Sequence, residues 1–147
     1  MIPETPKIQI KDGKKQIFDF VRKKYLALTP EESVRQYFIQ YLVNKRNYPL
    51  ARLAVEVELK IMNLKRRCDI VFFNQNKNPQ IVVECKAPEI KLLKQVFEQA
   101  AMYNMVLKAE YLCVTNGKES FFCKYNHTNN TYSFINDLPA YTSDIQK

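Results

Sequence analysis

The runs DIVFF at residues 69–73 and QIVVEC at residues 80–85 are short, apolar and rich in β-branched side chains. Between them, residues 74–79 read NQNKNP, a segment of turn-forming Asn and Pro. This pattern predicts two neighbouring strands joined as an antiparallel hairpin in the middle of a sheet. An acid opens the first run, at Asp69, and the group Glu84-Cys85-Lys86 spans the end of the second.

A hairpin and a helix are predicted before these runs. Asp12-Gly13, whose residues both tolerate a positive φ, separates strand-like segments at 8–10 and 16–18. Residues 29–32, TPEE, supply an N-cap Thr, a Pro at the first helical position and a capping-box Glu. Apolar residues then recur at helical spacing and predict a helix that continues to about Lys45.

Further strands and a second helix complete the predicted order. Over residues 52–59 the spacing predicts one half-buried strand, with Leu53, Val55, Val57 and Leu59 on one face. Pro88 ends the strand at 80–85, and helical spacing predicts a helix over 89–107. Asn116-Gly117 joins predicted strands at 111–115 and 120–124, and one more short strand is expected at 132–134.

The predicted fold class is α/β, with a mixed sheet of the α+β kind and the order α, β, β, β, α, β, β after the N-terminal hairpin. The 147 residues, of which 46% are hydrophobic, suffice for one domain with its own core. We expect a single domain over 1–147, with its core at about 26–125. Residues 1–25 are then an N-terminal β ornament, and 126–147 are a C-terminal extension.

The amino-acid composition indicates which class of binding partner the protein has and where it is located. Lys and Arg number 23 against 15 Asp and Glu, which gives a net charge of +8 and favours a polyanion, although solvated surface charge is the alternative. A transmembrane stretch and a signal peptide are both missing from the sequence, so we expect no membrane association and a cytoplasmic location. The four cysteines lack CxxC spacing and are expected to be buried thiols. The single His127 lies among polar residues, which argues against a His-based site.

Four acid-x-Lys groups occur in the sequence, but only Glu84-Cys85-Lys86 ends a buried run. Residues two positions apart on a strand point to the same face, so Glu84 and Lys86 are expected to lie together. Asp69 can approach Glu84 across the hairpin. Two carboxylates this close repel each other, and burial destabilises both charges. A hard divalent cation such as Mg²⁺ relieves both effects.

The same three side chains support two interpretations. Beside a bound cation, Lys86 could position or deprotonate an attacking water and neutralise a phosphate oxygen. Without one, Asp69, Glu84 and Lys86 form a partly buried ion-pair cluster at a strand end. The place of Asp69 at the start of a buried strand favours the catalytic interpretation.

Three segments carry a resemblance to a known family: LTPEESVRQ at 28–36, DIVF at 69–72 and VECKAP at 83–88. They resemble the PD-(D/E)xK nuclease superfamily and, more closely, the stand-alone form of the N-terminal nuclease domain of type I restriction enzyme R subunits, over roughly residues 16–125. The resemblance implies a restriction-endonuclease-like α-β-β-β-α-β core and a Mg²⁺ site in which Mn²⁺ can substitute. Asp69, Glu84 and the backbone carbonyl of Cys85 would bind the metal, Lys86 would be catalytic, and Glu31 would complete the site.

Other positions qualify this resemblance. Helical angles place Glu31 beside the apolar face, while Glu32 is expected to point away and to close the capping box. Gln99 and Tyr103 match a Q-x-x-x-Y motif that supports the site or contacts DNA, and an ordinary helix face is the alternative. Cys68 stands where the superfamily has Pro. A GxxxxGK[ST] phosphate loop is missing from the sequence, so this chain alone is not an ATP-driven motor.

The expected function is Mg²⁺-dependent endonuclease cleavage of DNA in restriction. Five basic residues near the predicted site could bring phosphates to the metal through contacts to the backbone: Lys65, Arg66, Arg67, Lys91 and Lys94. Separate motor or specificity subunits are expected partners besides DNA. The alternative is a nucleic-acid-binding or assembly module with the same fold, inactive without a partner.

Overall fold

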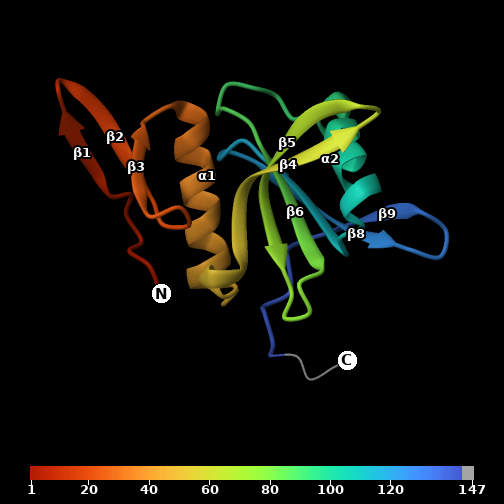
Figure 1. Ribbon diagram of the computed structural model, residues 1–147. Coiled ribbons are helices and arrows are strands. Elements are labelled where there is room, and N and C mark those ends of the chain that lie inside the picture. Colours follow the sequence, from red (N-terminus) through yellow and green to blue (C-terminus); the bar gives the residue numbers. More distant parts are fainter. Residues whose placement is uncertain (144–147) are drawn as a thin grey trace.

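A computed structural model describes residues 1–143, in which two helices lie on opposite faces of a six-stranded sheet (Figure 1). The strands run in the order β4-β5-β6-β7-β8-β9. Neighbours are antiparallel except β6 and β7, which are parallel. Their bounds are β4 Leu53–Ile61, β5 Leu64–Phe73, β6 Pro79–Cys85, β7 Tyr111–Thr115, β8 Ser120–Asn126 and β9 Thr131–Ile135. The mixed sheet and the β5–β6 hairpin confirm the sequence prediction.

Helix α1 (Pro30–Gln40) begins where the sequence predicts, because Thr29 Oγ1 accepts a hydrogen bond from the Glu32 N–H at 3.0 Å. Its last turn continues as a π-helical segment, Tyr41–Lys45, so the helical region ends at the predicted residue. A short 3₁₀ segment, Leu50–Arg52, then leads into β4. The N-terminal end of α1 is thus held by its cap.

A separate three-stranded antiparallel sheet lies beside α1, on the side away from the six-stranded sheet (Figure 1). It consists of β1 (Ile8–Lys11), β2 (Lys14–Asp19) and β3 (Lys24–Ala27). Asp12 and Gly13, at φ 52° and 76°, form the predicted hairpin turn. Sequence reasoning missed β3, a four-residue strand that is too short for a periodic pattern.

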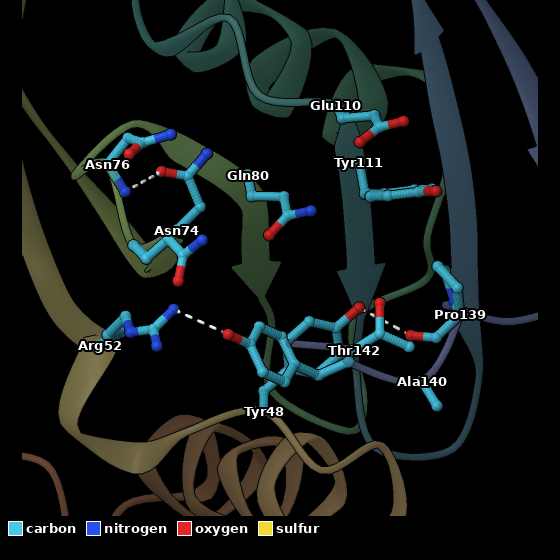
Figure 2. A pocket seen from close by; sticks show the side chains of 12 residues that line it. Tyr48, Arg52, Asn74, Asn76, Gln80, Glu110, Tyr111, Pro139, Ala140 and Thr142 are labelled. Atoms are coloured by element: carbon cyan, nitrogen blue, oxygen red, sulfur yellow. Dashed lines mark hydrogen bonds between the residues drawn. The ribbon is translucent and has the colours of Figure 1, made fainter. Parts of the chain in front are cut away.

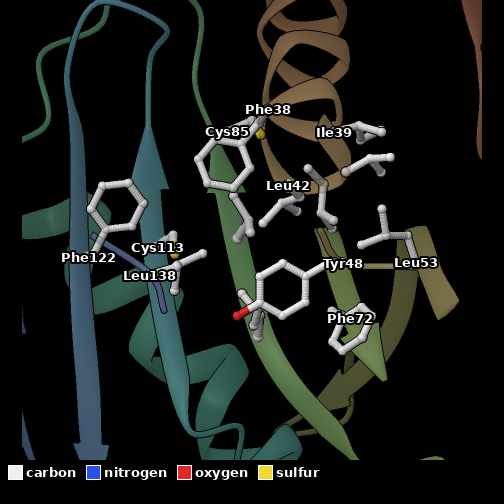
Figure 3. Packing of buried hydrophobic residues seen from close by; sticks show 14 of the residues in the cluster. Phe38, Ile39, Leu42, Tyr48, Leu53, Phe72, Cys85, Cys113, Phe122 and Leu138 are labelled. Atoms are coloured by element: carbon white, nitrogen blue, oxygen red, sulfur yellow. The ribbon is translucent and has the colours of Figure 1, made fainter. Parts of the chain in front are cut away.

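The core lies on both faces of the large sheet. Phe38 of α1 and Leu42 of the π-helical segment pack with Phe72 and Tyr48 on one face (Figure 3). Residues of α2 such as Ala100 pack against the alternate side chains of the same strands on the other face. All four cysteines are buried and free, as predicted. The strands are therefore buried on both faces, which explains their continuous apolar runs.

Strand β4 changes face in its middle. Leu53 and Val55 belong to the cluster beneath α1, whereas Val57 and Leu59 belong to the cluster beneath α2. The prediction that all four share one face is therefore wrong. Glu56, between the two pairs, has φ 49°, and a left-handed residue breaks the two-residue alternation of a strand.

Two element bounds also differ from the sequence prediction. Helix α2 is Lys94–Leu107 and begins five residues later than residue 89, because Pro88 lies in a turn closed by Ile90 N–H donating to Ala87 O. Strand β5 begins at Leu64, so the basic run 65–67 is part of a strand instead of preceding it. The local turn delays the start of α2, whereas pairing with β4 extends β5 toward its N-terminal end.

The C-terminal part forms the edge strand β9 as predicted, followed by a segment that packs back on the core through Leu138. The last four residues of the predicted C-terminal extension, 144–147, lie outside the described residues. Within residues 1–143, none of the helices has the length and apolar character needed to cross a bilayer.

Candidate active site

Asp69 and Glu84 lie opposite each other where β5 and β6 separate. The ladder between these strands begins at Ile70 and Val83, which places Asp69 one residue before it and Glu84 one residue after. Here the Cys85 N–H donates to Asp69 Oδ2 at 2.7 Å instead of pairing with a backbone carbonyl of β5. Both carboxylates are buried, with 8% and 4% of their residue surfaces exposed.

Burial and proximity together change the protonation of Glu84. Its pKa is raised to about 8, first by burial and then by the charge of Asp69, while Lys86 lowers it. When no cation is bound, burial and the neighbouring Asp69 therefore favour the protonated form of Glu84. This is the behaviour of two buried carboxylates that share one site.

Lys86 lies beside this pair. Its Nζ is 3.3 Å from Glu84 Oε2. The Lys86 N–H donates to Thr115 O at 2.8 Å, so the chain beyond β6 stays attached to the end of β7. The three side chains that the sequence singled out are thus brought together at one end of β6.

Helix α1 contributes a cation that sequence reasoning missed. Arg35 is buried, and its Nη2 donates to Asp69 Oδ1 at 3.3 Å. The signal was present in the sequence, because Arg35 follows Glu31 by four residues and therefore lies one turn further along the same helix face. What the sequence lacked was any indication of which strand that face meets.

Glu31 also lies near the carboxylates. Burial raises its pKa, the charge of Asp69 raises it further, and Arg35 and Lys86 lower it. Glu32 does not point away as expected. Its carboxylate is 3.3 Å from Arg35 Nη1 and accepts from Gln36 Nε2 at 3.0 Å, so its side chain is part of a buried polar cluster.

On α2, Gln99 Nε2 donates to the Tyr103 hydroxyl at 3.1 Å. Tyr103 is buried, and its pKa is raised by burial and then by the charge of Glu84. The predicted Q-x-x-x-Y pair therefore lies on the Glu84 side of the site. Helix α2 packs on the sheet face opposite α1.

The predicted phosphate-contacting residues are all exposed. Lys65, Arg66 and Arg67 lie on β5, and the Arg67 guanidinium is 3.9 Å from Glu56. Lys91 lies in the loop before α2. Lys94 opens that helix and is 3.9 Å from Glu98. None of these positions is buried by the fold, so each is available to a polyanion.

The donor set fits a hard cation. Glu84 Oε1 is buried and, within residues 1–143, has no hydrogen-bond partner, which is the state expected of an oxygen that awaits a ligand. Asp69 and Glu84 match the one or two carboxylates that Mg²⁺ uses while it retains waters. The same stretch contains no group of three or more His, Cys, Asp or Glu side chains arranged to hold a metal.

A hollow of about 520 Å³ lies at the other end of β6, between Gln80, Tyr111, Tyr48 and the turn that contains Asn74 (Figure 2). It is lined by residues from the beginnings of β6 and β7, whereas Glu84 and Lys86 lie at the end of β6. None of the predicted site residues lines it. The chemistry that the sequence indicates is therefore not located in this hollow.

Residues 30–139 match the family described as type I restriction enzyme R protein N terminus. Among solved structures, the chain resembles a fragment assigned to the HsdR subunit of a type I restriction enzyme from Vibrio vulnificus YJ016, with a TM-score of 0.55 and 17% identity over 78% of this chain and 24% of that one. It also resembles a protein assigned as a nuclease of DUF820 from Anabaena variabilis ATCC 29413, with a TM-score of 0.46 and 14% identity over 92% and 80% of the two chains. No curated protein matches the chain.

Proposed function

Because this chain belongs to the family of the type I restriction enzyme R protein N terminus, we propose that it is a Mg²⁺-dependent endonuclease that hydrolyses the DNA backbone. The match spans 24% of the HsdR fragment that the chain resembles. Besides DNA, motor or specificity subunits are the partners that we propose for it. The observation that carries the proposal is the convergence of Asp69, Glu84 and Lys86 at one strand end, where the buried oxygen Glu84 Oε1 has no partner among residues 1–143.

In this proposal Asp69, Glu84 and the Cys85 carbonyl hold the cation, and Glu31 approaches from α1. Bound Mg²⁺ supplies positive charge to the phosphate and makes a coordinated water more acidic. Glu84 releases its proton when the site is loaded, since a cation stabilises the ionised carboxylate. Lys86 orients the attacking water and neutralises a phosphate oxygen.

A second function is favoured by the ion pair of Arg35 and Asp69. A carboxylate that already has a buried guanidinium beside it needs no metal for stability, as in a nucleic-acid-binding or assembly module that is inactive without a partner. The first function predicts that the protein cleaves bound DNA, and the second predicts that it binds DNA without cleaving it.

Supercoiled plasmid incubated with Mg²⁺ or Mn²⁺ separates them. The wild-type protein should nick or linearise the plasmid, and Lys86→Ala should reduce the rate by about 10² to 10⁴, the range typical of a lost proton-transfer group. Asp69→Ala should abolish cleavage. The matched control is Lys14→Ala, an exposed lysine of β2. Cleavage that persists in both site variants contradicts the proposal, and binding without cleavage by the wild type supports the second function.

A further inference from the structure

The N-terminal three-stranded sheet lies outside the residues that match the family, yet it contacts the candidate site through Arg22. Arg22 lies in the turn between β2 and β3. Asp19, which is completely buried, holds that turn: its Oδ1 accepts from the Val21 N–H at 2.8 Å, and its Oδ2 accepts from Arg22 Nε. These contacts within the turn orient the Arg22 guanidinium independently of its contacts to other elements.

Arg22 contacts two acids of the domain core. Its Nη1 donates to Glu56 Oε2 at 2.6 Å, and its Nη2 lies 3.7 Å from Glu32 Oε1. Glu56 is the left-handed residue at which β4 changes face, and the pairs around it place it opposite Asp69. A non-glycine residue keeps this strained conformation inside a strand only when the surrounding contacts maintain it, and such residues are frequent at functional sites.

Both acids also face Arg35. The Arg35 Nη1 lies 3.3 Å from Glu32 Oε1 and 3.9 Å from Glu56 Oε1, while Nη2 reaches Asp69. Three carboxylates thus surround one buried guanidinium. Arg22 adds a second positive charge beside Glu32 and Glu56, so Arg35 does not have to balance both acids and stays directed at Asp69.

We propose that Arg22 is a positioning residue for Asp69, acting through Glu56 and Arg35, so that the N-terminal sheet sets the geometry of the metal ligand. This inference rests on the proposed function, since it assigns a role toward the cation. Asp69 is oriented by two donors, the Cys85 N–H on one oxygen and Arg35 on the other. Partners that orient a ligating carboxylate contribute to metal affinity without touching the ion.

The test measures Mn²⁺ binding directly, by titration calorimetry or by the electron spin resonance of free Mn²⁺. Arg22→Gln should bind Mn²⁺ about 10-fold more weakly than the wild type, the lower end of the effect of such partners. Arg22→Lys, which keeps the charge, should bind more tightly than Arg22→Gln. The control Lys15→Gln removes an exposed charge from β2 and should bind as the wild type does.

A double variant distinguishes positioning from a general loss of structure. In Arg22→Gln/Glu56→Gln the surplus negative charge beside Arg35 is gone, so Arg35 should return to Asp69 and Mn²⁺ affinity should recover toward the wild-type value. Circular dichroism of each variant establishes that it is folded. If Arg22→Gln alone does not fold, the comparison of the double variant with Arg22→Lys and wild type replaces it.

Each outcome has one meaning. Mn²⁺ affinity that is unchanged in Arg22→Gln, or not recovered in the folded double variant, overturns the role of Arg22 and leaves the proposed function intact. A wild-type protein that binds no Mn²⁺ contradicts the proposed function, and the positioning role falls with it.

Discussion

The ammonium of Lys86 lies 3.3 Å from Glu84 Oε2, while the other oxygen of the same carboxylate, Oε1, is buried without a partner in the described part of the chain. One carboxylate therefore has one oxygen paired and one available. Asp69 differs, because both of its oxygens accept hydrogen bonds, one from the Cys85 N–H and the other from Arg35 of α1. The two acids thus differ in their contacts: both oxygens of Asp69 are held by donors, whereas one oxygen of Glu84 remains available.

The first prediction concerns pH and the stability of the metal-free protein. Burial and Asp69 raise the pKa of Glu84 from 4.5 to about 8, so the unfolded chain loses this proton at lower pH than the folded protein. The stabilising contribution is fully present below pH 4.5 and is lost as the pH rises to about 8. Urea unfolding in EDTA at a series of pH values should therefore show stability falling across this window.

Glu84→Gln should remove most of that decline, because an amide cannot ionise. Glu119→Gln, an exposed position in the turn before β8, is the control and should keep the wild-type slope. Added Mg²⁺ should offset the decline in the wild type, since ligand binding to the folded state adds stability. Parallel pH profiles for wild type and Glu84→Gln would show that this carboxyl does not govern the transition.

The second prediction concerns the basic strand β5. Lys65 and Arg66 are exposed, and each phosphate contact contributes about 0.9 to the slope of log affinity against log salt on duplex DNA. The double variant Lys65→Gln/Arg66→Gln should therefore show a slope that is shallower by up to about 1.8. Fluorescence anisotropy with a labelled duplex in EDTA measures it.

Lys14→Gln/Lys15→Gln removes the same charge from β2 in the other sheet and should change the slope less. Equal slopes for the two double variants would mean that DNA contacts the protein elsewhere. Specificity for sequence should be unaffected in both, because backbone contacts carry no base information.

The third prediction concerns the cap of α1, which carries Glu31 and Arg35 to the site. Thr29→Ala removes the acceptor of the Glu32 N–H and should lower the free energy of unfolding by about 0.5 to 2 kcal/mol. Chemical denaturation measures the change, with Thr128→Ala in the exposed turn between β8 and β9 as control. A difference below the error of the measurement would show that the helix start is held by packing alone.

The fourth prediction compares two glycines with positive φ. A Cβ at Gly117 would lie 3.2 Å from Val34 Cγ2 of α1, whereas a Cβ at Gly13 would meet nothing within 4 Å. Both Gly→Ala changes impose left-handed strain, but only Gly117→Ala also crowds the Val34 side chain of α1. Thermal unfolding should show the larger loss for Gly117→Ala. An equal loss in the two variants would mean that α1 adjusts without penalty.

The sequence by itself determined most of the elements and one half of the site. Local turn chemistry at Asp12-Gly13 and the cap at Thr29 depend on neighbouring residues, so they can be read from a few positions. Glu84 and Lys86 share a strand end because two-residue spacing is a property of any strand. The apolar runs of β5 and β6 indicated burial on both faces for the same reason.

Only the tertiary structure decided how α1 and the N-terminal sheet meet the site. Arg35 and Asp69 are 34 residues apart in the sequence, and so are Arg22 and Glu56. No local sequence pattern therefore encodes either contact. The face change at Glu56 is equally hidden, because its side chain reads as the polar half of a regular alternation. Periodicity reports which residues are buried, whereas the pairing of buried charges depends on where whole elements pack.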